Sequence, residues 1–367
     1  MTVGPVAVDD GIPGGLFGMA TALVAIPSVS HVEGPMADAV EAALRLCPWL
    51  SVERVGDNVV ARTDLGRGQR VLLAGHLDTV PPTGGNEEPR IEGETLYGVG
   101  AADMKGGVAV FLHLAGTIPE PSVDVTWCFY ACEEVSREFN GLRQLWDQRP
   151  ELLVADAAIL GEPTGGVVEA GCQGTLRVRI SLEGRRAHTA RPHTGRNAIH
   201  RLSPLLATVT GYRGRRPVLD GCEYVEQLQV VEVSGGVSGN VVPDEASLLI
   251  NHRFAPDRTP EQAESSLREL LGPHLEQGDR WELTDSAAGA PPALDHPVLA
   301  GLVEATGSRP QAKQGWTDVS SLWAHGIPAA NFGPGDPLVA HTPHEHVSSG
   351  ELERAAAVLG TLLVAER

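Results

Sequence analysis

The chain has 367 residues, of which 42% are hydrophobic and 20% are charged, and its formal net charge at pH 7 is −19. This length favours two domains. The acidic balance argues against nucleic acid and anionic membranes as partners, because both attract clustered Lys and Arg. No apolar run reaches the roughly 18 residues of a membrane span.

The cysteines and the N-terminus indicate the cellular compartment. The five cysteines are odd in number and lack Cys-x-x-Cys spacing, so neither a disulfide framework nor a structural zinc site is expected. The N-terminus carries Asp9 and Asp10 and no Lys or Arg before its first apolar residues, whereas a secretory signal normally begins with a basic region. Reduced cysteines in a cytoplasmic protein are therefore predicted.

The first 170 residues predict alternating helices and strands. Apolar residues spaced by three and four indicate helices, and short apolar runs bounded by turn residues indicate strands. Such alternation is typical of an α/β fold, with a central, mostly parallel sheet flanked by helices. The expected helices are 16–25, 35–46 and 108–114, and the expected strands are a pair within 52–63, then 71–74, 123–131 and 157–160.

The pattern changes after Cys172. Residues 175–184 alternate as an antiparallel strand does, and the change in character favours an inserted α+β domain over a continuation of the first sheet. We expect this domain to span 174–285, and the α/β domain to comprise 1–173 and 286–367. The inserted domain is expected to contain strands 224–233 and 246–254 and helices 197–212 and 259–271, and helices 297–305, 318–325 and 349–365 are expected after it.

Polar residues follow three of the predicted buried strands. His76 and Asp78 follow the first, Glu133 and Glu134 the second, and Glu162 the third. In parallel sheets, ligands gather at the carboxyl ends of strands. The adjacent carboxylates of Glu133 and Glu134 repel each other unless a cation or a proton separates them. The alternative explanation for this pair is a solvated helix start, where the helix dipole favours acidic residues. The candidate ligands of a hydrolytic metal centre are, in order, His76, Asp103, Glu134, Glu162 and His341.

Five motifs follow one another along the chain: GHLDTVP at 75–81, ADMKGG at 102–107, EE at 133–134, GEPT at 161–164 and AHTP at 340–343. These ordered motifs resemble the co-catalytic dizinc amidohydrolases, which include aminoacylases, acetylornithine deacetylase, glutamate carboxypeptidases and succinyl-diaminopimelate desuccinylases. The resemblance covers nearly the whole chain and implies a zinc-peptidase-like catalytic domain with an inserted lid. Stretches 169–177, 315–319 and 331–337 are similar to the actinobacterial desuccinylases of that family.

This resemblance implies a role for each site residue. Asp103 would bridge two metal ions, with a strained cis peptide bond beside it. His76 and Glu162 would complete one metal site, and Glu134 and His341 the other. The remaining implied roles are Asp78 as the residue that orients the His76 ring, Glu133 as general base and acid, and His188 as oxyanion donor from its own or the partner subunit.

Two His and three carboxylates, with no Cys, suit two Zn²⁺ ions, with Co²⁺ or Mn²⁺ as alternatives. Two divalent ions bring four positive charges against three ligand carboxylates, so the centre keeps about one positive charge, and metal binding lowers the pKa of a water to about 7.

The substrate end of the site rests on fewer residues. By resemblance, Asn240 and Arg253 would contact the substrate carboxylate or the other subunit, although a surface arginine on a strand is the alternative for Arg253. Thr317 and Asp318 would line the pocket. At position 173 this chain has Gln, whereas some members of the family have a basic residue there.

The resemblance therefore implies hydrolysis of N-succinyl-LL-2,6-diaminopimelate to LL-2,6-diaminopimelate and succinate, in lysine and diaminopimelate biosynthesis. An acetylornithine deacetylase or a carboxypeptidase on the same scaffold is the alternative. A non-catalytic binding relative is disfavoured, because all five ligands and Glu133 are present. The inserted domain is expected to act as a lid and to form a homodimer.

Overall fold

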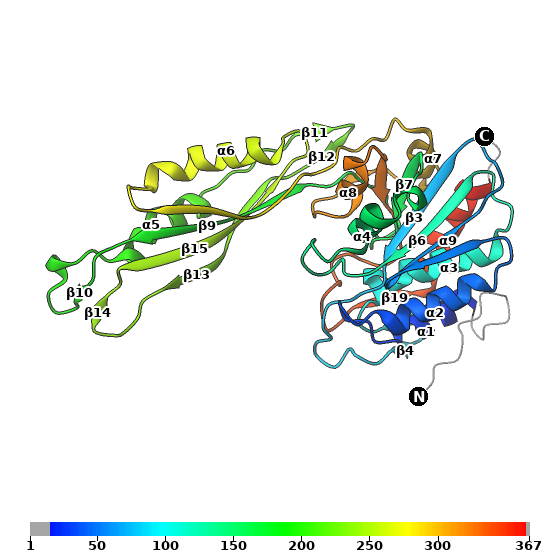
Figure 1. Ribbon diagram of the computed structural model, residues 1–367, viewed down its shortest axis with the longest axis horizontal. Coiled ribbons are helices and arrows are strands. Elements are labelled where there is room, and N and C mark those ends of the chain that lie inside the picture. The colour runs from blue at the N-terminus through cyan, green and yellow to red at the C-terminus, as the bar shows by residue number, and fades with distance from the viewer. Residues whose placement is uncertain (1–14, 365–367) are drawn as a thin grey trace. The chain divides into compact units, whose positions relative to one another are not determined.

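The structure is a computed structural model that describes residues 15–364. Its contacts divide the chain into two compact units (Figure 1). The first unit comprises the chain up to Ala170, Ala293–Gln311 and the chain from Ser321 on, and the second comprises Gly171–Pro292 and Ala312–Ser320. The expected domains differ from this division by a few residues at each junction and by the segment Ala312–Ser320. Asp9 and Asp10 lie outside the described residues.

The first unit is built on an eight-stranded sheet. The four central strands β6, β3, β7 and β18 are parallel, whereas β1 with β2, β2 with β6, and β8 with β18 are antiparallel. The predicted α/β fold with a mostly parallel sheet is confirmed. In sheet order the strands are β1 (Ser51–Val55), β2 (Asn58–Arg62), β6 (Asp124–Tyr130), β3 (Arg70–His76), β7 (Ala157–Leu160), β18 (Ala329–Asn331), β8 (Glu169–Ala170) and β17 (Gln311–Ala312).

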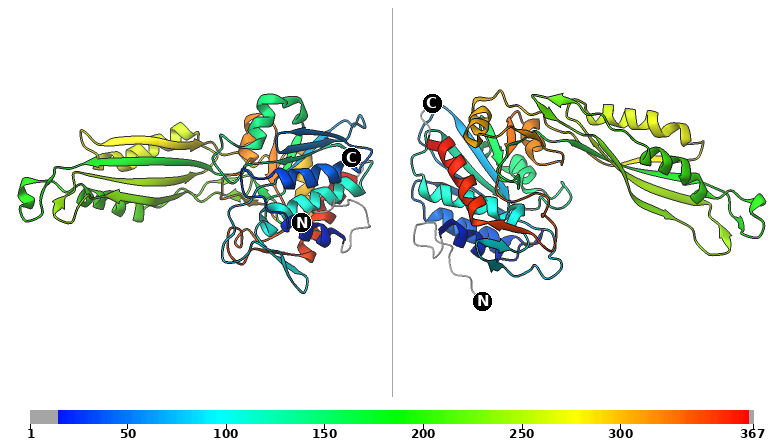
Figure 2. Two further views of the ribbon diagram at one scale, coloured as in Figure 1. Left: turned by 60° about the horizontal axis from the view of Figure 1, so that its bottom comes forward. Right: turned by 180° about the vertical axis from the view of Figure 1, so that it is seen from behind.

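Helices flank this sheet, and α3 lies at the centre of their packing. It contacts β3 and β6 of the sheet as well as α1 and α9 (Figures 1 and 2). Nearly every α3 residue is apolar and buried, as a helix enclosed on several sides requires. The helices are α1 (Gly15–Val24), α2 (Gly34–Arg45), α3 (Gly106–Thr117), α4 (Gly141–Gln148), α7 (Pro297–Thr306), α8 (Val319–Ala324) and α9 (Ser349–Val364).

A small second sheet borders the metal-site loops. It joins β4 (Arg90–Glu92), β5 (Thr95–Tyr97) and β19 (His346–Ser348) in the order β19-β5-β4. The central strand β5 is antiparallel to both of its neighbours. The strand β4 is exposed along its whole length.

The second unit contains a four-stranded antiparallel sheet with α5 and α6 packed on it. Burial alternates along β15, so the even-numbered residues face the helices. The sheet order is β13 (Gln227–Gly235), β15 (Glu245–Phe254), β9 (Gly174–Glu183), β16 (Arg280–Ala287), and the helices are α5 (Ala198–Thr210) and α6 (Pro260–Leu271). Short pairs join β10 (Ala187–His188) to β14 (Val241–Val242) and β11 (Val218–Leu219) to β12 (Cys222–Glu223).

All five cysteines are buried and free, so the expectation of no disulfide framework is confirmed. Over residues 15–364, none of the helices combines the length and the apolar character that crossing a membrane requires.

Candidate metal centre

The candidate ligands arise at the carboxyl ends of three adjacent parallel strands. His76 ends β3, the pair Glu133-Glu134 follows β6, and Glu162 lies two residues beyond β7. Because β6, β3 and β7 are parallel neighbours, these ends meet at one edge of the sheet, where α/β proteins bind ligands.

Asp103 lies between two histidines. Its Oδ1 is 3.1 Å from Nε2 of His76, and its Oδ2 is 3.4 Å from Nε2 of His341. Nε2 of His341 lies 2.8 Å from Oε1 of Glu134. A carboxylate whose two oxygens face different imidazoles is suited to bridge two cations. The structure therefore brings four of the five predicted ligands, from segments up to 265 residues apart, into direct contact.

The donor set fits divalent metal ions. One donor atom from each of His76, Asp103 and Glu134 lies within 4.8 Å of the other two. Zinc takes nitrogen and carboxylate oxygen ligands at about 2.0–2.2 Å, so donors this close together can share an ion. Glu162 is 6% exposed and is the further carboxylate at this edge of the sheet.

The charge balance of this cluster also favours a cation. Burial disfavours the charged form of His76, but the hydrogen bond and the charge of Asp103 raise its pKa well above the usual value. Hydrogen bonds to Asp103 and Glu134 raise the pKa of His341 to about 10. Burial opposes ionisation of Asp103, yet both histidines hold its pKa below the usual range. In the metal-free protein, the positive charge of the protonated imidazoles thus balances the negative charge of the carboxylates. Metal ions that bind there displace the imidazole protons.

Asp78 has two separate contacts. Its backbone carbonyl lies 3.0 Å from Nδ1 of His76, whereas the nearest carboxylate oxygen is 3.6 Å from that nitrogen. The carboxylate instead accepts the backbone N–H groups of Glu133 and Glu134 at 2.9 and 3.0 Å, and the hydroxyl of Ser30 at 2.7 Å. Asp78 therefore orients the His76 ring through its main chain, and its side chain holds the Glu133-Glu134 turn.

Glu345 is a contributor that the sequence interpretation missed. Its Oε1 accepts the backbone N–H groups of Ala102 and Asp103 at 3.1 and 3.0 Å, and the side chain is buried. It thus fixes the main chain that carries the bridging carboxylate. The peptide bond between Asp103 and Met104 is cis, as the resemblance implied. The sequence feature that could have pointed to Glu345 is its position four residues after the candidate ligand His341.

Comparison with known proteins identifies the family. Residues 72–365 match the model of peptidase family M20/M25/M40. The chain belongs to this family. Curated relatives resemble it over nearly their whole length. It is 45% identical to the succinyl-diaminopimelate desuccinylase of Corynebacterium glutamicum, over 92% of this chain and 93% of the relative. It is 51% identical to a Mycobacterium tuberculosis protein assigned as the desuccinylase DapE, over 93% of this chain and 96% of the relative.

Solved structures share the fold. The aminopeptidase PepT of Bacillus cereus superimposes with a TM-score of 0.77 at 18% identity, covering 95% of this chain and 97% of PepT. The metallo-carboxypeptidase Sso-CP2 of Sulfolobus solfataricus gives a TM-score of 0.75 at 17% identity, covering 95% and 98%. At these identities the likeness concerns the fold alone. Together with the desuccinylase relatives, family membership makes this chain a metal-dependent hydrolase.

The remaining predicted site residues of this M20 chain belong to the second unit. His188 and Asn240 are brought close together, because β10 pairs with β14 and the N–H of Thr189 donates to the carbonyl of Asn240 at 3.0 Å. Arg253 lies on β15 and donates through Nε to Oδ1 of Asn251 at 3.2 Å. Thr317 is 4% exposed.

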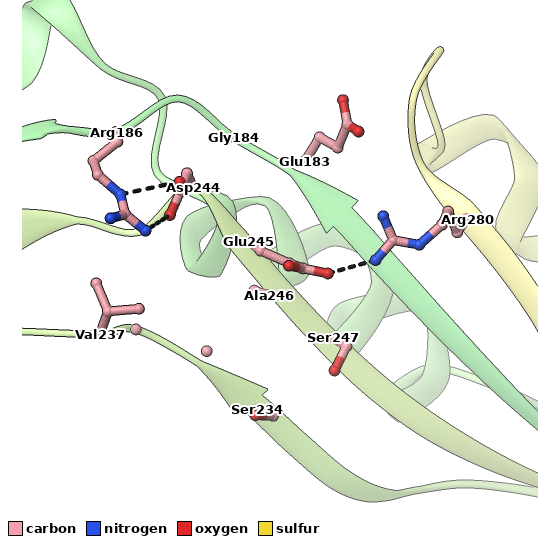
Figure 3. Close-up of a pocket in the computed structure, with 12 residues that line it drawn as sticks. Glu183, Gly184, Arg186, Ser234, Val237, Asp244, Glu245, Ala246, Ser247 and Arg280 are labelled. Atoms are coloured by element: carbon pink, nitrogen blue, oxygen red, sulfur yellow. Dashed lines mark hydrogen bonds and ion pairs between the residues drawn. The ribbon is translucent and has the colours of Figure 1, made fainter.

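A surface cavity of about 530 Å³ is a different feature of the second unit (Figure 3). Arg186 in its lining pairs with Asp244, and Arg280 pairs with Glu245. These charges compensate one another. None of the lining residues is a candidate metal ligand, so this cavity is not part of the metal centre.

Proposed function

We propose that this chain is a cytoplasmic succinyl-diaminopimelate desuccinylase, which hydrolyses N-succinyl-LL-2,6-diaminopimelate to LL-2,6-diaminopimelate and succinate. The observation that carries the proposal is the 45% identity to the Corynebacterium glutamicum desuccinylase over more than nine-tenths of both chains. The cluster of Asp103 with His76, His341 and Glu134 supports a hydrolytic centre of the kind that this reaction needs.

Two divalent ions, Zn²⁺ with Co²⁺ as the alternative, are proposed as cofactors. His76, Glu162 and one oxygen of Asp103 would hold one ion, and Glu134, His341 and the other oxygen of Asp103 the second. When bound, the ions act as Lewis acids and lower the pKa of a water molecule. The buried Glu345 supports this arrangement, because it holds the backbone of Asp103 in place before any metal binds.

Glu133 is proposed to move the proton. Water adds to the carbonyl carbon of the succinyl amide, Glu133 accepts one proton from that water, and the carboxyl group returns it to the leaving amine as the C–N bond breaks. The contact between Asp78 and the N–H of Glu133 at 2.9 Å supports this role, because it holds the main chain of a half-buried carboxylate that adjoins the ligand Glu134.

His188 is proposed as the donor to the developing oxyanion. Its Nδ1 accepts the N–H of Ala190 at 3.0 Å, so the neutral ring carries its hydrogen on Nε2. The ring is exposed, and its Nε2–H can therefore donate to a substrate carbonyl that gains negative charge. This tautomer is the one that an oxyanion donor requires.

The succinyl carboxylate is proposed to bind at Arg253, with Asn240 and Thr317 as neighbouring contacts. A guanidinium can give a carboxylate two parallel hydrogen bonds. Among residues 15–364, the side-chain hydrogen bond that the structure describes for Arg253 uses Nε and not the two terminal nitrogens. Gln173 is an unsuitable substitute for the basic residue of some relatives. Its side chain is buried and donates to the carbonyl of Val225 at 2.9 Å.

The second unit is proposed as the lid and as the site of homodimer formation. β13 is an edge strand of the four-stranded sheet, and an edge presents unpaired backbone groups to another chain. Val231 and Val233 on this strand are 57% and 53% exposed. A second copy of the chain would cover them.

The test of the proposed reaction is product identification. Protein loaded with Zn²⁺ is incubated with N-succinyl-LL-2,6-diaminopimelate, and succinate and LL-2,6-diaminopimelate are measured by mass spectrometry, with and without a chelator. We expect equal amounts of both products, and neither product after chelation. Absence of both products from the zinc-loaded protein contradicts the proposal.

A further inference from the structure

Two buried carboxylates bind three consecutive backbone N–H groups next to the proposed base. The N–H of Cys132 donates to Oε1 of Glu33 at 3.0 Å. The N–H groups of Glu133 and Glu134 donate to Asp78. Successive N–H groups that point into one concavity form an anion-binding site. Here the anions belong to the protein itself, and Glu33 and Asp78 are 1% and 0% exposed.

Cys132 is the residue of this turn whose conformation needs support. Its φ is +58°, a region that a residue with a Cβ rarely occupies. Such conformations persist where the surrounding structure fixes them, and they cluster at functional sites. Glu33 supplies this restraint twice, because its Oε1 also accepts the Cys132 thiol, with Sγ at 3.2 Å.

Glu33 follows a loop that is tied to the strand end carrying Asp78. It immediately precedes α2, but its side chain makes no capping contact with that helix. The preceding loop is tied to the strand end, since the N–H of Thr79 donates to the carbonyl of Ser28 at 2.9 Å and Ser30 donates to Asp78. The carboxylate of Glu33 is therefore directed at Cys132 rather than used for the helix.

We propose that Glu33 is a positioning residue that fixes the direction of the Glu133 side chain through the backbone of Cys132. The proposal rests on the function proposed above, in which Glu133 moves the proton. A rotation about the backbone of Cys132 swings Glu133, and a displacement of about 1 Å at a reacting group lowers the rate about a hundredfold. The N–H of the metal-ligand candidate Glu134 is held separately, by Asp78 at 3.0 Å, so we expect metal binding to change less than the direction of Glu133.

The test compares two substitutions that separate geometry from charge. Glu33→Gln loses the charge but keeps an oxygen acceptor at the same reach, whereas Glu33→Asp keeps the charge but withdraws the acceptor by one methylene. We expect Glu33→Asp to lower kcat about tenfold or more, with KM within about threefold and metal content unchanged. Glu33→Gln is expected to keep kcat within about threefold of wild type. Glu41→Ala, an acidic residue of α2 that pairs with Arg45 and Arg54, is the matched control and is expected to match wild type.

A second readout needs no substrate. Hydrogen–deuterium exchange of the segment 131–134 is expected to be faster in Glu33→Asp than in wild type and unchanged in Glu33→Gln. The proposal is overturned if Glu33→Asp keeps the wild-type kcat, or if kcat falls equally in both variants. It is also overturned if KM or metal content changes in place of kcat, or if the exchange of segment 131–134 is unchanged in Glu33→Asp. If the wild-type protein does not hydrolyse the succinyl substrate, the function proposed above fails, while the exchange pattern still decides whether Glu33 holds the turn.

Discussion

Oδ1 of Asp103 lies 3.1 Å from Nε2 of His76, and the two side chains are 14% and 1% exposed. The other oxygen of Asp103 faces His341, so one carboxylate links the two halves of the site. We therefore expect Asp103→Ala to lose both metal ions, whereas Glu134→Ala loses one. Metal content measured by mass spectrometry after dialysis checks this difference. One retained ion in Asp103→Ala would show that the carboxylate does not bridge.

Glu133→Gln separates proton transfer from metal binding. The amide cannot accept a proton at neutral pH, so kcat is expected to fall by about 10²–10⁴-fold, with two metal ions retained. The exposed Glu138→Gln, five residues further along the chain, is the control and is expected to keep wild-type kcat. Steady-state kinetics with metal analysis of both variants measures the effect. Substantial turnover by Glu133→Gln would remove Glu133 from the proposed role.

The dimer proposal predicts a link between assembly and activity. Val233→Lys places a charge on the exposed edge strand β13 and is expected to convert dimer to monomer in analytical ultracentrifugation. The control Val154→Lys changes a valine of similar exposure, 62% against 53%, in the first unit. If His188 acts across the dimer, kcat falls with the loss of dimer. A wild-type protein that sediments as a monomer contradicts the proposal.

His252 gives the second unit a pH-dependent stability. Burial and the charge of Arg258 lower its pKa to about 4, and within the part of the chain that the structure describes neither ring nitrogen has a hydrogen-bond partner. The unfolded chain binds this proton near pH 6.5 and the folded chain only near pH 4. The contribution to stability is therefore complete above pH 6.5 and is lost as the pH falls, by about 2 kcal/mol between pH 7 and pH 5.

Urea unfolding of His252→Phe at these two pH values measures that contribution. The variant is expected to lose less stability than wild type on acidification, by about the same 2 kcal/mol. His200→Gln, at an exposed position of α5, is expected to behave as wild type. Identical pH dependence in wild type and His252→Phe would show that this ring does not titrate on unfolding.

The central part of the fold was predictable because its residues carry periodic patterns. Continuous apolar runs gave β3, β6 and β7, and the ordered motifs gave the metal cluster. The strand β16 is buried only at its end, and it was missed because its exposed residues form no apolar run. Glu33 and Glu345 were missed because an isolated carboxylate in a loop carries no sign of burial. Both carboxylates accept backbone N–H groups, which are the same in every sequence.

The most direct test of the proposed activity compares three substrates on the zinc-loaded protein. The values of kcat/KM are measured for N-succinyl-LL-2,6-diaminopimelate, N-acetylornithine and a dipeptide. We expect kcat/KM for the succinyl substrate to exceed the other two values by about a hundredfold or more, because a site built to bind the carboxylate of the succinyl group rejects substrates whose acyl group lacks one. Equal or faster turnover of N-acetylornithine or of the dipeptide would contradict the assignment.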